Sequence, residues 1–207
     1  MKTTLHLIFS LLLLALIGCQ KTLNTEEPIS TLKTTSVFQQ LMLEEVNFAR
    51  TNPQGYAESR LKNAYSNGTD NGSYTFMKKV VPVSSLSFNN ALNISAGNYA
   101  QFLADKNLMG HNQDGTPLKR AVTVGFTGSS IGENIAASTS DAYNGVADPG
   151  LAAVNFVRLL LIDTGVANLG HRMTMMNASY STVGIGYSHN SLSTFVNYTV
   201  QDYGGGF

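Results

Sequence analysis

The spacing of apolar residues predicts two amphipathic helices in the first half of the chain. The first begins at Ser36, which forms a capping-box pattern with Gln39, and apolar residues then recur at helical spacing over 38–49. It ends at Asn52-Pro53, because the residue before proline is disfavoured in the α region. The second helix is expected over 90–107. It carries one apolar stripe, made of Leu92, Ala96, Tyr99 and Leu103.

Shorter elements are expected around these helices. A brief helix over 54–61 precedes a polar, exposed loop over 67–73. Gly110 suits the C-cap of the helix over 90–107. Asp148-Pro149 predicts the N-cap and first position of a further helix that stops at Gly165, and His171 begins the next short element.

The last part of the chain has the alternation of β-strands. Val183, Ile185 and Tyr187 alternate with smaller or polar residues, the segment 189–191 predicts a turn, and a second alternating run covers 196–200. Helices followed by an antiparallel hairpin predict an α+β domain.

The first 35 residues are expected to lie outside the folded domain. Residues 1–18 have a charged start and a short apolar run, as in a signal peptide, and are too short to span a membrane. The run ends at Cys19, the only cysteine, in a context that resembles the lipobox of bacterial lipoproteins. Lipidation at Cys19 and a polar tether over 19–35 would then precede a domain over 36–207. A plain secretory signal with a chance cysteine is the alternative.

Composition fits one globular domain and narrows the partners. The 207 residues contain 43% hydrophobic and 13% charged residues, which suits a sizeable core. Basic and acidic residues both number 13, without long runs of one sign, so the sequence does not predict binding to nucleic acid.

Three residues in Gly-containing segments are the candidates for chemistry. His111 and His171 each follow a glycine, and Glu133 lies in Gly132-Glu133-Asn134. Two imidazoles and a carboxylate can bind a divalent metal, such as zinc, or act as an acid–base pair. Of the other two histidines, His6 lies in the signal segment and His189 in the predicted turn. No Gly-x-Ser-x-Gly motif or cysteine in the mature chain supplies a nucleophile.

These segments together resemble the CAP superfamily of SCP-like, cysteine-rich secretory, venom antigen and pathogenesis-related proteins. The likeness covers about residues 37–203. It rests on four segments in family order: Leu43–Arg50, Ser95–Asn112, Ile131–Ile135, and Gly170–Arg172 with Val183–Tyr187.

The resemblance implies a three-layer α–β–α sandwich with an antiparallel central sheet and an open cleft. It also implies that two histidines and two acidic residues line the cleft and bind zinc or a similar ion. The residues at the family positions are His111, Glu133 and His171. The family's second acid is normally in a Trp-x-x-Glu helix that this sequence lacks, and Asp163 is the candidate to replace it with a shorter reach.

Each candidate also has a purely structural interpretation. His111 would cap helix carbonyls, His171 would form hydrogen bonds within the core, and Glu133 would satisfy loop amides. Asp163 would be a turn residue. The sequence leaves these alternatives open.

The sequence therefore predicts a lipid-anchored protein of the bacterial envelope, at the outer membrane or facing the periplasm or cell surface. Its first predicted function is binding of a divalent metal, a ligand, or both in the cleft. The ligand class remains open among lipids, small molecules and proteins. A metal-dependent, peptidase-like hydrolase and a purely structural or adhesive protein are the alternatives, so the sequence does not decide whether the domain is an enzyme.

Overall fold

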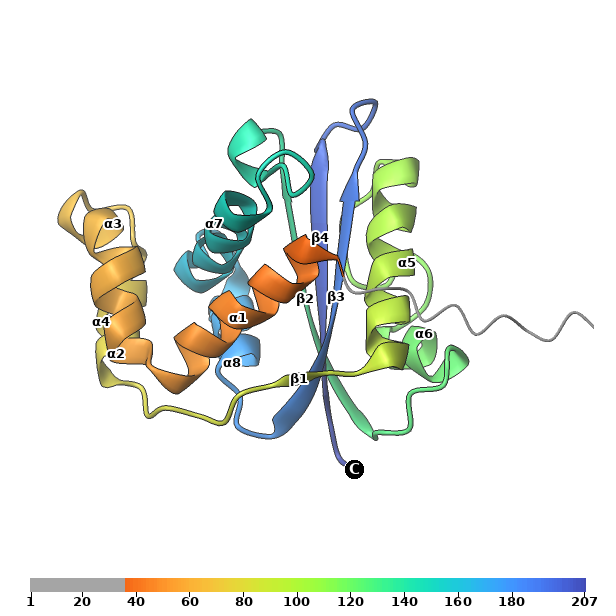
Figure 1. Ribbon diagram of the computed structural model, residues 1–207, viewed down its shortest axis with the longest axis horizontal. Helices are drawn as coiled ribbons and strands as arrows, with labels where there is room; N and C mark the ends of the chain where they lie inside the picture. Colours follow the sequence, from red (N-terminus) through yellow and green to blue (C-terminus); the bar gives the residue numbers. More distant parts are fainter. Residues whose placement is uncertain (1–35) are drawn as a thin grey trace, which may run out of the picture. The chain divides into compact units, whose positions relative to one another are not determined.

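The computed structural model describes residues 36–207, and a four-stranded sheet lies at its centre (Figure 1). The strand order is β1-β3-β4-β2. Their bounds are Ser87–Phe88 (β1), Ser130–Ser138 (β2), Tyr180–His189 (β3) and Asn197–Gly205 (β4). The three long strands are antiparallel, as predicted, whereas the two-residue β1 pairs parallel with β3.

Helices cover both faces of the sheet and make three layers (Figure 1). One layer contains α1 (Val37–Thr51), α7 (Pro149–Ile162) and α8 (Gly170–Met175), and the other contains α5 (Asn90–Lys106) and α6 (Pro117–Thr123). The α2–α4 region flanks the first layer: α2 (Pro53–Tyr56), the π-helical turn η1 (Ala57–Leu61), α3 (Lys62–Ser66) and α4 (Ser73–Lys79). Short 3₁₀ turns are η2 (Asp141–Tyr143) and η3 (Ala167–Leu169). The expected α+β sandwich is therefore confirmed.

Helix starts follow the predictions more closely than helix ends. The capping box between Ser36 and Gln39 is present, and Asp148 caps α7 with Pro149 in its first turn. The predicted C-caps are wrong: α5 ends at Asn107 and α7 at Asp163, both in the left-handed conformation, before Gly110 and Gly165 are reached. Asparagine and aspartate tolerate that conformation better than other side chains, so glycine is not required there.

Two segments that were not predicted as helix or strand turn out to contain regular structure. The helical segment beginning at Pro53 continues through α3 to Ser66, and α4 begins at Ser73, inside the predicted loop 67–73. Asp70 and Ser73 are buried, so this segment packs against the domain. The Gly-Glu-Asn segment lies in β2 and is paired with β4 along its whole length, although no strand was predicted there. The second alternating run, predicted over 196–200, continues in β4 as far as Gly205.

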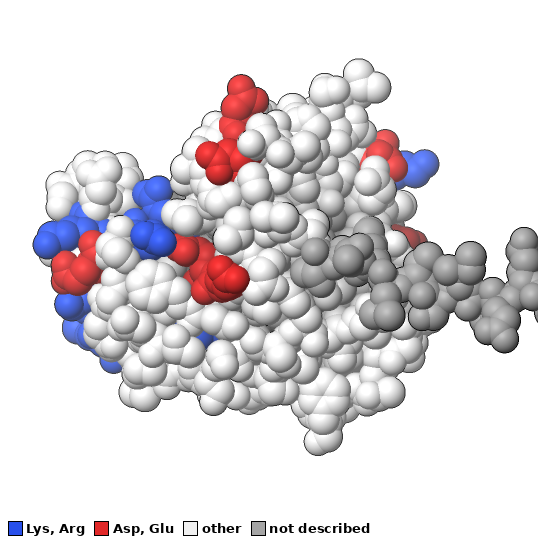
Figure 2. All heavy atoms as spheres, viewed as in Figure 1, with Lys and Arg blue, Asp and Glu red and all other residues white. Residues whose placement is uncertain are grey.

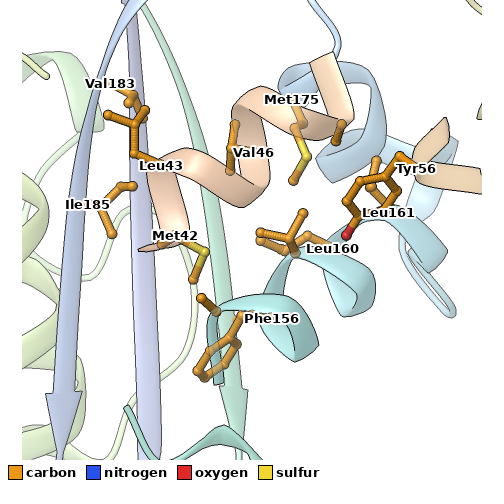
Figure 3. Close-up of a cluster of buried hydrophobic side chains, with 14 of the residues drawn as sticks. Met42, Leu43, Val46, Tyr56, Phe156, Leu160, Leu161, Met175, Val183 and Ile185 are labelled. Carbon is orange, nitrogen blue, oxygen red and sulfur yellow. The ribbon is translucent and has the colours of Figure 1, made fainter. Parts of the chain in front are cut away.

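The main core lies between the sheet and the helices of the first layer. Figure 3 shows Met42, Leu43 and Val46 of α1 between the sheet and α7. A second buried cluster forms under α5, and it includes the predicted residues Ala96, Tyr99 and Leu103. Burial of two helix layers on one sheet is the main source of stability, since each large apolar side chain contributes roughly 1.5–3 kcal/mol.

The glycines of β3 allow α5 to approach the sheet closely. A Cβ atom at Gly186 would lie 2.0 Å from the Ala96 carbonyl oxygen, and one at Gly184 would lie 2.0 Å from the Leu92 carbonyl carbon. Both obstacles are helix backbone, which cannot rotate away as a flexible side chain can. The helix therefore lies directly on the strand because these two positions have no side chain.

We expect Gly186→Ala to destabilise the domain by about 1–3 kcal/mol, because the added methyl overpacks this contact. Gly150→Ala is the matched control: its Cβ would meet only Asp148 Oδ1, at 3.7 Å, in a helix where alanine is preferred. Urea unfolding measures both variants. Equal stability of the two would contradict the close helix–strand contact.

Most of the face shown in Figure 2 is uncharged, and its basic side chains lie mainly over the α2–α4 region, with smaller charged groups elsewhere. There Glu58 accepts hydrogen bonds from Lys78 and Tyr74 and pairs with Lys62. The Lys78 contact is the largest cause that lowers the pKa of Glu58 to about 2. No single helix within residues 36–207 has the length and hydropathy for a membrane span. The helical segments 149–162 and 167–175, which are bent relative to each other, meet the length and hydropathy criteria only when they are taken together.

Candidate functional site

The first candidate histidine is held by a buried carboxylate. His111 lies in the loop after α5, and its Nδ1 is 2.8 Å from Oε1 of Glu133 on β2. The Glu133 side chain is 1% exposed, whereas that of His111 is 50% exposed. A carboxylate only accepts, so His111 Nδ1–H is the donor in this hydrogen bond. Within the described residues, His111 Nε2 has no hydrogen-bond partner.

Arg120 of α6 fixes the other side of this carboxylate. Its Nη2 pairs with Glu133 Oε2, and its Nη1 donates to the carbonyl oxygens of His111, at 2.8 Å, and Gly115. The guanidinium carbon also lies 3.4 Å from the centre of the Tyr99 ring, a cation–π contact. Arg120 therefore contacts both the Glu133 carboxylate and the backbone of His111, the histidine that this carboxylate orients.

Tyr99 connects the same loop to α5. Its hydroxyl donates to the Gly110 carbonyl oxygen at 2.5 Å and accepts from the Gln113 amide at 3.1 Å. Tyr99 is 1% exposed and belongs to the apolar stripe of α5. The sequence predicted it only as a core residue. Its hydroxyl additionally fixes the position of His111 relative to the helix.

The second histidine is also paired with a buried carboxylate. His171 Nδ1 at the start of α8 lies 3.0 Å from Asp163 Oδ1, and the Asp163 side chain is fully buried. This is an ion-pair distance, although the two atoms do not have hydrogen-bond geometry. Asp163 Oδ2 accepts from the Arg172 amide at 3.2 Å. Asp163 is therefore the C-cap residue of α7 and also lies next to His171.

The pKa of His171 is lowered from its usual value, first by burial and then by the charge of His111. The nearby Asp163 carboxylate opposes this shift. His171 is therefore neutral at pH 7, the state in which an imidazole binds a metal or accepts a proton.

Both histidine–acid pairs contact β2, which is one of the two edge strands of the sheet. Successive strand residues point to opposite faces, and here Glu133 binds His111 while the Asn134 side chain donates to the His171 carbonyl oxygen at 3.1 Å. The loop after α5 belongs to one helix layer and α8 to the other. We call His111, Glu133, Asp163 and His171 the two-histidine cleft.

The two candidate acids lie behind the imidazoles. In residues 36–207, no group of three or more His, Cys, Asp or Glu side chains is placed to hold an ion together. Both acids instead lie against Nδ1 atoms, as the carboxylates behind metal-binding histidines do in known sites. The Nε2 atoms of the two imidazoles are therefore the candidate metal donors that remain. Glu133, predicted as a direct ligand, is occupied by His111 and Arg120.

Sequence reasoning missed Arg120 and Asp202. Asp202 on β4 is directly opposite Glu133 in the sheet register and is completely buried. Burial, and next the charge of Glu133, raises the pKa of the Asp202 carboxyl well above its usual range. Asp202 could have been noticed from the sequence, because it is an aspartate inside an alternating strand pattern. Arg120 had no such signal, because its partner Glu133 lies on another element.

A three-layer sandwich with paired histidines and acids at a sheet edge defines a CAP-type domain. The family model described as CAP, the cysteine-rich secretory protein family, matches residues 43–203, and the chain belongs to this family. Comparison with curated protein sequences found no match.

Solved structures of similar fold come from several organisms. An extracellular SCP-domain protein from Bacillus anthracis is 22% identical with a TM-score of 0.44, over 59% of this chain and 34% of that chain. An outer surface protein of Borrelia burgdorferi is 15% identical with a TM-score of 0.47, over 72% of this chain and 93% of that chain. Venom allergen-like protein 4 of Schistosoma mansoni is 15% identical with a TM-score of 0.47, over 83% and 90%. The chain thus spans about a third of the Bacillus protein.

Proposed function

We propose that the domain is a binding module of the cell envelope whose two-histidine cleft binds a divalent metal, with zinc as the first candidate. The observation that carries this proposal is the pair of imidazoles, each with a carboxylate against Nδ1. The hydrogen bond to Glu133 orients the His111 ring with its Nε2 available, and Asp163 lies at ion-pair distance from His171 Nδ1.

Two imidazole ligands leave further coordination positions for water or for a ligand. A bound metal would supply Lewis acidity, which attracts carbonyl or carboxylate groups. The chain itself supplies orientation: Arg120 holds Glu133, Glu133 holds His111, and Asp163 holds His171. The two imidazoles would therefore bind the metal, and its remaining coordination positions would be free for a ligand.

The test is a zinc titration of the full chain, purified without a histidine tag and followed by calorimetry. Loss of a residue that orients a metal ligand typically weakens metal affinity about 10–100-fold, and loss of the ligand itself costs at least as much. We therefore expect His111→Ala and His171→Ala each to raise the zinc dissociation constant by about 100-fold or more.

His189→Ala is the matched control, since that ring contacts Asn197 and lies outside the cleft. Zinc affinity that is the same in all three variants and the wild type would refute the metal proposal.

We also propose that Cys19 carries a lipid that anchors the domain to the envelope. Cys19 and the signal and tether segments lie outside the described residues, and this proposal rests on the sequence. Cys19→Ala is expected to move the protein from the membrane fraction to the soluble fraction and to remove the lipid mass. Membrane association at unchanged mass would show that no lipid is attached there.

Hydrolysis is a second candidate function, favoured by the contact between a neutral histidine and a buried acid. His171 beside Asp163 has the arrangement of a general base with its orienting carboxylate. Glu133→Gln separates the two functions when zinc is saturating, because ligand binding would persist there while turnover of a peptide substrate would collapse. Turnover that survives in this variant would exclude Glu133 from the reaction.

A further inference from the structure

Asp202 of β4 is a fully buried carboxyl group, and neither of its oxygens has a hydrogen-bond partner within residues 36–207. In the strand register, Gly184 of β3 lies on one side of it and Glu133 of β2 on the other. Gly184 has no side chain, and the Glu133 carboxyl group lies within reach of Asp202. Two ionised carboxylates only accept, so no hydrogen bond joins them unless one of them carries a proton.

Ser95 of α5 lies against the same carboxyl group. Its hydroxyl oxygen is buried and also lacks a regular hydrogen bond. The Nη atoms of Arg120 are used by Glu133 and by two backbone carbonyl oxygens, so they are not donors to Asp202. A buried polar group without a partner is costly. An arrangement that satisfies Ser95 Oγ and both oxygens of Asp202 together is therefore favoured.

The charges around Asp202 favour a proton on one of the two carboxyl groups. Arg120 of α6 pairs with Glu133, and its single positive charge cannot balance two carboxylates. The other titratable groups at this place are His111, which is charged only if protonated, and Tyr99 of α5, whose pKa is raised by burial. Burial, and next the charge of Glu133, raises the pKa of Asp202 well above its usual range.

The hydrogen bonds of Glu133 decide which carboxyl group carries the proton. His111 Nδ1–H donates to one oxygen of Glu133, and Arg120 Nη2–H donates to the other. Such donors stabilise a carboxylate, and Asp202 has none with regular geometry. Each carboxylate oxygen can also accept a second hydrogen bond. Glu133 is therefore the acceptor, and Asp202 is the group that carries the proton.

We propose that Asp202 is protonated at pH 7 and donates to Glu133, while its other oxygen accepts from Ser95 Oγ–H. This arrangement satisfies all three buried oxygens and leaves Arg120 and Glu133 as a balanced ion pair. Glu133 is then held by a third donor, and through it the ring of His111. Asp202 is thus a positioning residue for the two-histidine cleft. This role rests on the proposed metal binding, whereas the proton on Asp202 does not.

Infrared spectroscopy of the full chain at pH 7 tests for the proton directly. The C=O stretch of a protonated carboxyl group is separate from the bands of a carboxylate, and we expect such a band in the wild type and its loss in Asp202→Asn. Asp105→Asn is the matched control, because Asp105 is exposed on α5, and it is expected to keep the band. Absence of the band from the wild type, or its persistence in Asp202→Asn, would overturn the proposal.

The pH dependence of stability gives a second readout. The pKa of Asp202 is raised in the folded state, so the wild type loses stability as the pH rises from about 4 through the folded pKa. Asparagine keeps a donor and an acceptor but has no proton to lose. In urea unfolding, Asp202→Asn is therefore expected to be more stable than the wild type at pH 7. The ratio of the two unfolding constants should grow by up to about tenfold per pH unit between about pH 5 and pH 7. A constant ratio over this range would contradict a proton on Asp202.

Zinc titration tests the positioning role separately. Asp202→Ala removes the donor to Glu133 and is expected to raise the zinc dissociation constant about tenfold, whereas Asp202→Asn restores the donor and should rescue the affinity. Urea unfolding establishes that the alanine variant is folded. Wild-type zinc affinity in Asp202→Ala would exclude the positioning role. A wild type that binds no zinc would refute the metal proposal and this role with it, and the infrared band would still decide where the proton lies.

Discussion

Arg50→Met is expected to destabilise the domain by about 4 kcal/mol, the largest effect of any single substitution that we predict. Arg50 is fully buried at the end of α1. Its guanidinium donates to four backbone carbonyl oxygens: Ser84 at 2.9 Å, Met175 at 2.6 Å, Asn177 at 3.1 Å and Tyr180 at 3.2 Å. Methionine fills similar space but leaves these carbonyls without a donor.

Urea unfolding at pH 7 measures the loss, and Arg158→Met is the control with the same change of side chain. Arg158 is only part-buried and makes one long contact, to Asn155 at 3.4 Å. We expect this control to cost about 1 kcal/mol or less. If both variants lose the same stability, the four carbonyl contacts of Arg50 contribute nothing beyond its packing.

Arg120→Met is expected to destabilise the domain by about 3 kcal/mol and to weaken zinc binding. It leaves the Glu133 carboxylate, which is 1% exposed, without its countercharge and next to the buried Asp202. It also removes the donors to the His111 loop. Removing one partner of a buried pair is costly because the remaining charge has no compensation.

A double-mutant cycle isolates the charge effect. Arg120→Met combined with Glu133→Gln removes both charges, and we expect the pair to recover at least about 1 kcal/mol relative to the sum of the single variants. Lys119→Met, one position away and exposed, is the single-site control and should change stability by less than about 0.5 kcal/mol. Additive losses in the cycle would show that Arg120 and Glu133 do not act as a pair.

The helices and the hairpin could be predicted because their apolar residues follow a regular period. The stripe of α5 and the alternation of β3 both have one buried face, and burial of that face leaves a clear pattern. β2 has no such pattern, since its polar residues Glu133 and Asn134 are buried by contacts to opposite layers. The sequence therefore contained the family motif on this strand without the signal for a strand.

The contacts among the candidate residues could not be predicted from the sequence. His111, Glu133, His171 and Asp163 were the candidates, and the structure pairs each histidine with one acid. Which acid contacts which histidine depends on where the edge strand and the end of α7 lie in space. Local sequence does not encode this. Arg120 was missed for the same reason, because its role is defined by partners on other elements.

The two glycines of β3 also set how closely α5, and the His111 loop that follows it, can lie to the sheet. A side chain at position 184 or 186 fits only if α5 moves outward from the sheet. The Tyr99 hydroxyl ties the Gly110 loop to this helix, so His111 would move with it. His171 lies in the opposite layer and would stay in place. The position of the His111 loop relative to the sheet thus depends on the absence of two side chains in the middle of β3.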